Sequence, residues 1–150
     1  MTKTQFMEVL SETLENSRTG VLATADAEGK PSMRWMTPTI LGSQQGLLYA
    51  VTSKRFAKKK DLESNPHGQW LIQTKALTRI INVSGKINLI DNPNLKSEVI
   101  EAIGPHLRVF WKVNENPEDL IVLETVIDRA SVFIPLSGER ELVDFTGGGK

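Results

Sequence analysis

The residues best suited to chemistry lie in one short basic segment, Thr52 to Lys60. Its sequence, TSKRFAKKK, places two hydroxyls and several cations after an apolar stretch, Leu47 to Val51, and before Asn65-Pro66. We expect a strand, a turn and the start of a helix here. Backbone N–H groups at a helix N-terminus, with Ser and Lys side chains, are suited to a phosphate group. Taken alone, the segment is more typical of a solvated basic helix face.

A second segment upstream, Pro31-Ser32-Met33-Arg34-Trp35-Met36, shifts the interpretation towards ligand binding. Arg34 supplies a cation that could face a bound anion, whereas an arginine in an exposed salt bridge would contribute little. Trp35 follows Arg34 on the expected strand, so the two side chains face opposite ways. If Arg34 faces a ligand, we expect Trp35 to pack inward.

The length, net charge and cysteine content of the chain exclude several classes of protein. A chain of 150 residues predicts a single domain over residues 1–150. Eighteen basic and eighteen acidic residues cancel, so we expect no general attraction to nucleic acid or anionic membranes. The absence of cysteine excludes disulfides and thiolate chemistry. Neither His67 nor His106 has the spacing of a metal site or a catalytic triad, so no metal is expected.

Nothing in the sequence indicates targeting to or insertion in a membrane. The first residues are amphipathic and lack the pattern of a signal peptide. No apolar run approaches the roughly 20 residues of a membrane span. We expect a soluble, cytoplasmic protein.

The pattern of apolar residues predicts a mainly β (α+β) chain with peripheral helices. Thr2 with Gln5 fits a capping box, and Asn92-Pro93 fits a cap followed by a first helical residue. Helices are expected near residues 2–16, 56–64, 92–104 and 105–112. Seven candidate stretches, 20–24, 31–41, 47–52, 69–74, 79–90, 120–126 and 130–136, are expected to supply the about six strands of the sheet.

The connections between these strands favour an antiparallel six-stranded barrel over a doubly wound sheet. Tight turns between the first three strands predict a meander, and Asp128-Arg129 is interpreted as the turn between the last two. Gly85 could mark a bend in the long stretch 79–90. Residues 146–150 are glycine-rich, and we expect them to be a disordered tail.

The order of these segments resembles the pyridoxamine-phosphate-oxidase-like split barrels that bind flavin, in particular their small general stress protein branch. The resemblance covers roughly residues 6–136. It rests on the pieces Gly20-Val21-Leu22-Ala23-Thr24, Pro31-x-x-Arg34-x-Met36, Leu48-Tyr49-Ala50-Val51-Thr52-Ser53, Lys58-x-x-x-Leu62-x-x-Asn65-Pro66 and Trp111. It implies a homodimer with two cofactor sites at the interface. The implied cofactor is FMN, with FAD as an alternative.

The resemblance also implies which residues approach the flavin ring. The side chain of Arg34 would face the cofactor, and the backbone of Trp35 and Met36 would approach the ring. Gln73 would lie near the ring of the flavin held mainly by the other subunit. Trp111 would lie near the ligand or the dimer seam.

The same resemblance assigns a clamp for the ribityl chain and the phosphate. Thr52 and Ser53 match the strand end that contacts these groups, and Lys58 matches the basic residue that binds the phosphate. Lys59 is a second candidate. Charge-assisted hydrogen bonds contribute about 1.5–3 kcal/mol each. Two or three of them, less the cost of ordering, are consistent with roughly micromolar binding or better.

The implied function is that of a stress-related flavin-dependent oxidoreductase. No residue is a convincing acid–base catalyst, so the flavin would carry most of the chemistry. Pyridoxamine phosphate oxidase itself has a terminal segment with arginine and histidine groups for its substrate. This chain has no histidine after His106, so we do not expect oxidation of a vitamin B6 phosphate.

Three alternatives remain open from the sequence. The first is a non-catalytic flavin-binding or flavin-sensing module of the same fold. The second is a barrel that binds haem or a deazaflavin, in which His67 or His106 could be an axial ligand. The third is an interaction protein with an empty cleft, in which the lysine run is a solvated face.

Overall fold

A computed structural model describes residues 1–42, 44–55, 59–104, 112 and 116–147. The helices are α1 (Lys3–Ser17), α2 (Lys59–Ser64) and α3 (Pro93–Ile103), and a 3-10 turn spans Pro117–Asp119. The strands are β1 (Gly20–Ala25), β2 (Pro31–Met36), β3 (Leu47–Ser53), β4 (His67–Gln73), β5 (Ile80–Ile90), β6 (Leu120–Ile134) and β7 (Glu139–Asp144). The helix expected at residues 105–112 lies outside the described residues, apart from residue 112.

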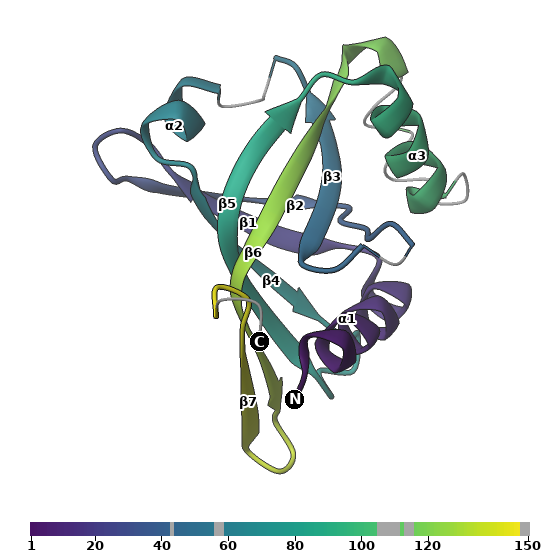
Figure 1. Ribbon diagram of the computed structural model, residues 1–150, viewed down its shortest axis with the longest axis vertical. Helices are drawn as coiled ribbons and strands as arrows, with labels where there is room; N and C mark the ends of the chain where they lie inside the picture. The colour runs from purple at the N-terminus through teal and green to yellow at the C-terminus, as the bar shows by residue number, and fades with distance from the viewer. Residues whose placement is uncertain (43, 56–58, 105–111, 113–115, 148–150) are drawn as a thin grey trace.

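The strands form one antiparallel sheet in the order β2-β1-β4-β5-β6-β3, with β7 paired to β6 (Figure 1). The sheet is curled. Strands β1 and β3 are separated by three other strands in the sheet order, yet Leu22 of β1 and Leu48 of β3 pack in the same core. Beyond the end of β2, the backbones of Thr39 and Tyr49 exchange hydrogen bonds of 2.7 and 2.8 Å. This single bridge joins the two edges and leaves the barrel split. The predicted antiparallel split barrel is confirmed, with seven strands rather than six.

Two predictions about connections are wrong. The first three strands do not form a meander, because β3 pairs with β6 along its whole length rather than with β2. The stretch from Leu120 to Ile134 is one continuous strand, not two. Asp128, interpreted as part of a turn, is the extra residue of a bulge between the paired residues Ile127 and Arg129. A polar pair within an apolar run looks like a turn locally, whereas pairing with β5 and β7 keeps the strand extended.

The bend predicted at Gly85 is confirmed by the sheet register. The pairing of β5 with β6 shifts between Ser84 and Gly85. A Cβ atom at Gly85 would lie 2.3 Å from the carbonyl oxygen of Val126, so a side chain cannot fit without moving the backbone. Glycine therefore allows the close approach of β5 and β6 at the bend.

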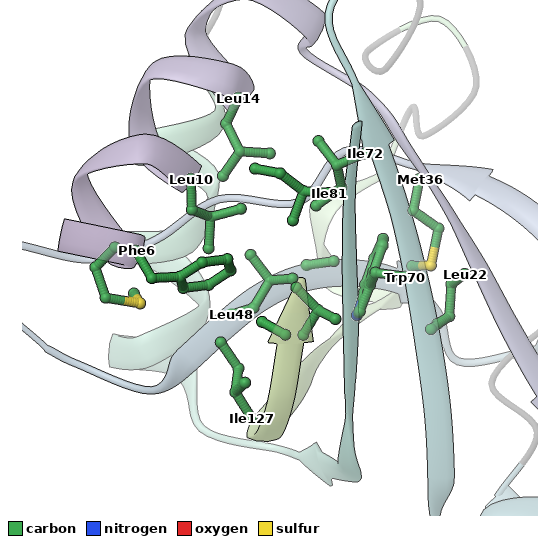
Figure 2. Close-up of a cluster of buried hydrophobic side chains, with 14 of the residues drawn as sticks. Phe6, Leu10, Leu14, Leu22, Met36, Leu48, Trp70, Ile72, Ile81 and Ile127 are labelled. Atoms are coloured by element: carbon green, nitrogen blue, oxygen red, sulfur yellow. The ribbon is translucent and has the colours of Figure 1, made fainter. Parts of the chain in front are cut away.

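The main core lies between α1 and the inner face of the sheet. Leu10 and Leu14 of α1 point towards Ile81, and Phe6 points towards Leu48 (Figure 2). Trp70 lies farther from α1, beside Met36. The capping box predicted for α1 is present, with Gln5 N–H donating to Thr2 Oγ1 at 3.1 Å and Thr2 N–H donating to Gln5 Oε1 at 2.8 Å.

A buried hydrogen bond orients Trp70, whose side chain is fully enclosed. Its Nε1–H donates to Thr125 Oγ1 at 2.9 Å, and this satisfies a polar group that would otherwise be costly to bury.

Helix α3 covers the outer face of β3 and the adjoining part of β6. Val99 and Ile103 of α3 pack there against Tyr49, Val51 and Val122. As predicted, Asn92 caps this helix and accepts hydrogen bonds from two backbone N–H groups at 2.9 and 3.1 Å. Within the described part of the chain, no helix is both long and apolar enough to cross a membrane.

Candidate functional site

A small cleft opens at the split of the barrel, and it brings together two of the residues singled out from the sequence. Arg34 of β2 and Thr52 of β3 both line it. These strands lie at opposite ends of the sheet order, so the curl of the sheet is what brings the residues together. The remaining lining residues are Leu22, Thr24, Leu62, Leu89 and Leu123. The cleft therefore combines one cation and two hydroxyls with an apolar wall.

Thr24 is a lining residue that the sequence interpretation did not assign to the site. It lies on the inner face of β1 and is only 8% exposed. Leu22 and Thr24 share the inward parity of the strand, so a polar residue at an inward position was the available signal. The hydroxyls of Thr24 and Thr52 form no hydrogen bond with any described residue, and both can serve a ligand.

Strand β2 divides its side chains between two environments. Arg34 is paired across the sheet with buried Leu22, and Met36 lies in the core near Trp70 (Figure 2). Trp35 points the other way and is 47% exposed. The prediction that Trp35 packs inward is therefore wrong for the single chain. Alternation along the strand is confirmed, but the face opposite Arg34 is the outside of the sheet rather than the core.

The predicted phosphate clamp is described only in part. Ser53 ends β3, and its Oγ accepts a hydrogen bond from Arg55 N–H at 3.2 Å, leaving its hydroxyl proton available. Lys59 is exposed at the first residue of α2. Lys58 and Trp111 lie outside the described residues, so their roles remain predictions.

Gln73 does not share the cleft with Arg34. It is the last residue of β4, exposed on the outer face of the sheet, and it pairs with Ile80 of β5. The two predicted site residues thus lie on opposite faces of one sheet. Arg34 and Gln73 can therefore contact the same flavin only if they come from two different copies of the chain.

The outer face of the sheet carries exposed apolar side chains in register. Across the sheet, Val21 lies between Trp35 and Leu71. Trp35, Met33 and Leu71 are 47%, 74% and 38% exposed, respectively. We call these four residues the outer apolar face. Exposed apolar patches of this kind mark interaction surfaces when they are contiguous.

The cleft itself is narrow in one chain. Its volume is about 10 Å³, close to the minimum for one water molecule. Ligand pockets usually have volumes of about 300–1,000 Å³. The described residues of one chain therefore form only part of the walls that a flavin would need.

The histidine in the described part of the chain lies elsewhere. His67 begins β4 and lines an open hollow on the outer side of the sheet together with Gln69, Ser84 and Asp128. No described residue belongs to a group of three or more possible metal ligands. Since His67 does not line the cleft with Arg34, the described residues give the cleft no axial ligand for haem. His106 lies outside the described residues.

Comparison with known proteins decides the family. The family described as pyridoxamine 5'-phosphate oxidase matches residues 6–131, a span that includes every residue lining the cleft. The chain belongs to this family. The resemblance predicted from the sequence is thereby confirmed.

Solved structures show the same fold. General Stress Protein 26 from Bacillus anthracis str. Sterne is 22% identical, with a TM-score of 0.66 over 91% of this chain and 98% of that one. A pyridoxamine 5'-phosphate oxidase-related, FMN-binding protein from Nostoc punctiforme is 14% identical, with a TM-score of 0.68 over 95% and 91% of the two chains. At these identities the likeness establishes the fold alone.

A third relative has the same fold but a different ligand. HutZ, the haem storage protein from Vibrio cholerae, is 15% identical, with a TM-score of 0.63 over 89% of this chain and 95% of that one. Proteins with this fold therefore differ in what they bind, and the ligand must be argued from the cleft.

Proposed function

We propose that this protein is a homodimeric FMN-binding oxidoreductase of the pyridoxamine 5'-phosphate oxidase family. The observation that carries the proposal is the cleft in which Arg34 meets Thr24 and Thr52 above an apolar wall. A cation and hydroxyl donors suit the polar chain and phosphate of FMN, and leucine side chains suit a flat aromatic ring. Lys58 and Lys59 would add charge to the phosphate end.

Two incomplete features of the single chain support the proposed homodimer. The cleft is too small to enclose a flavin, and the outer apolar face is uncovered. A second copy on that face would bury Trp35, and Gln73 of the partner copy would lie in the same interface, beside the edge strand β2 that carries Arg34. Aromatic side chains such as Trp35 are typical anchors of protein interfaces.

The chemistry would belong to the cofactor. A bound flavin supplies two-electron redox chemistry, and the protein supplies binding and orientation. The side chain of Arg34 would stabilise negative charge next to the ligand, and the leucines would exclude water from one face of it. The described lining contains no carboxylate, histidine or tyrosine, so none of these residues would act as a general acid or base.

Haem is less well supported than FMN. The cleft has no histidine among its described lining residues, and the hydroxyl and arginine donors suit a phosphate better than a metal. FAD carries the same flavin ring and a phosphate, so it would occupy the same cleft. The titration described next distinguishes FAD from FMN.

The direct test is a titration of ligand-stripped protein with FMN. Flavin fluorescence would report binding while light scattering reports the size of the particle. We expect saturable quenching at one FMN per chain in a dimer, weaker binding of riboflavin because it lacks the phosphate, and reduction of the bound flavin by a nicotinamide donor. No binding of FMN or FAD by the dimer would overturn the proposal. Binding without turnover by any donor would leave a flavin-binding module.

The contribution of Arg34 can be measured in the same assay. Arg34→Gln is expected to weaken FMN binding about tenfold or more, the usual loss when a charge-assisted hydrogen bond is removed. Lys30→Gln removes an equal charge from an exposed turn, where Lys30 pairs with Glu28 at 3.4 Å, and should bind FMN normally. If both variants bind FMN as the unchanged protein does, Arg34 is a structural residue.

A further inference from the structure

A second cavity lies on the other side of the core, between the ends of two helices. Its volume is about 180 Å³. It shares no lining residue with the cleft of Arg34. In Figure 1, α1 and α3 lie on the same side of the barrel, where the chain leaves β2. The walls come from α1, the segment after β2 and the end of α3: Ser11, Leu14, Glu15, Arg18, Thr37, Pro38, Thr39, Ile40, Ala102 and Ile103.

The wall from α1 carries two opposite charges on one helix face. Ser11, Glu15 and Arg18 are spaced so that they lie on the same side of the helix. Neither Glu15 nor Arg18 forms an ion pair with a described residue. Arg18 also caps α1 in a left-handed conformation, with a φ of 63°. The cavity rim therefore presents a carboxylate and a guanidinium, neither of which is paired with a described residue.

The floor of the cavity contains a polar group that lacks a partner. Thr37 is 3% exposed, and its hydroxyl bonds to no described residue. No fully enclosed side-chain polar atom lacks a partner in the described part of the chain, so the Thr37 hydroxyl is not fully enclosed, and Thr37 is one of the residues that line the cavity. Its neighbour Thr39 differs, because its Oγ1 donates to the Ile40 carbonyl at 3.4 Å.

Apolar side chains also line this partly open cavity, although its exposed lining as a whole is more polar than apolar. Leu14, Pro38 and Ile103 are buried and apolar, and they could contact the aliphatic part of a small molecule. The C-terminal ends of α1 and α3 both reach the cavity, and helix C-termini favour a positive charge. A cation beside Glu15 and these helix ends, and an anion beside Arg18, would match both charged walls.

From this arrangement we infer that the cavity is a binding site for a small zwitterion, namely a free α-amino acid with an aliphatic side chain. Its ammonium group lies between Glu15 and the helix C-termini, and its carboxylate binds Arg18. Its side chain contacts Leu14 and Ile103, and Thr37 donates a hydrogen bond from the floor. The site is separate from the proposed flavin site and does not depend on it.

The test uses L-leucine and two fragments of it as probes of the full-length protein. 4-Methylpentanoate lacks the ammonium group and 3-methylbutylamine lacks the carboxylate, while both keep the side chain. In amide NMR spectra, leucine is expected to cause saturable shifts in the residues that line the cavity, with a dissociation constant on the order of 1 mM. Each fragment should bind at least about tenfold more weakly.

Matched variants locate the binding. Arg18→Gln and Glu15→Gln should each weaken leucine binding about tenfold, and Thr37→Val, which keeps the shape, a few-fold. Glu8→Gln, an exposed change elsewhere on α1, should have no effect. None of the four should change FMN affinity.

Three results would overturn the inference. The first is the absence of saturable shifts with leucine up to about 50 mM, well above the expected dissociation constant. The second is equal binding of the amine or the acid alone. The third is leucine binding that Arg18→Gln leaves unchanged.

Discussion

Strands β3 and β2 differ in how their two faces are covered. In β3, Leu48 and Ala50 face the barrel core, while Tyr49 and Val51 pack under α3, so both faces are buried within one chain. In β2, the inward side is partly buried, but Trp35 and Met33 on the outer side are exposed. One end of the sheet is completed by a helix of the same chain, and the other end has no such cover among the described residues.

This difference supports the proposed second copy of the chain at β2. The strand that carries Arg34 on one face carries Trp35 on the other, so the cleft and the outer apolar face are two sides of a single layer. A protein that covers the outer face of β3 with α3 could have covered β2 in the same way. Among the described residues no helix covers β2 in that way, and this uncovered face is the structural argument for the proposed intermolecular interface.

The largest expected effect is a loss of stability from a substitution at the bend of β5, a strand that lies between β2 and β3 in the sheet order. Gly85→Ala places a Cβ atom 2.3 Å from the Val126 carbonyl oxygen, so the backbone must move. We expect a loss of about 3 kcal/mol, which lowers the melting temperature by roughly 6–12 °C for a domain of this size. Gly147→Ala is the control, because no atom lies within 4 Å of that position. Equal melting temperatures for the two variants would show that the bend does not require glycine.

The second-largest expected effect is a weaker dimer, caused by a substitution on the uncovered face of β2. Trp35→Ser is expected to weaken the dimer by about 30-fold or more, the loss of a typical interface anchor, and to weaken FMN binding with it. Sedimentation equilibrium across a range of protein concentrations measures the first effect. Leu77→Asn removes an apolar side chain of similar exposure, 49% against 47%, from a turn outside the face. A dimer that tolerates Trp35→Ser as well as Leu77→Asn would contradict the proposed interface.

The smallest expected effect is a change of stability with pH that arises from Tyr49, on the covered face of β3. Burial, followed by the charge of Glu124, raises the pKa of Tyr49 from 10 to about 12. The Tyr49 hydroxyl lies 3.2 Å from Glu124 Oε2 and donates a hydrogen bond to it. The unfolded chain loses the tyrosine proton at a lower pH than the folded chain, so stability is unaffected below pH 10 and falls between pH 10 and about 12.

Tyr49 is the only tyrosine in the sequence, so phenolate absorbance reports its titration directly. The folded protein should titrate near 12 and the urea-unfolded protein near 10. Tyr49→Phe should abolish the corresponding loss of stability. A folded protein that titrates at 10 would show that α3 does not shield this face.

Local signals in the sequence predicted much of the fold. Capping residues fixed the starts of α1 and α3, and the glycine in a long apolar stretch marked the bend in β5. These features depend on neighbours along the chain, and a sequence displays such neighbours directly. Alternation along β2 likewise predicted that Arg34 and Trp35 face opposite ways, but not which of the two faces inward.

Features that depend on distant residues could not be predicted in the same way. The pairing of β3 with β6 joins residues such as Ala50 and Leu123, and no local pattern identifies that partner. Asp128 looked like a turn because a bulge and a turn use similar residues. The exposure of Trp35 was missed because the type of an apolar residue in a strand does not tell whether the residue lies in the core or on the surface.

The central claim is that each flavin site combines Arg34 of one copy with Gln73 of the other. Mixed dimers of Arg34→Glu and Gln73→Trp subunits, purified with two different affinity tags, test it most directly. Each parent homodimer should fail to bind FMN, because both of its sites are defective. The mixed dimer contains one intact site and should bind one FMN per dimer. A mixed dimer that binds none, or a Gln73→Trp homodimer that binds FMN normally, would contradict the account.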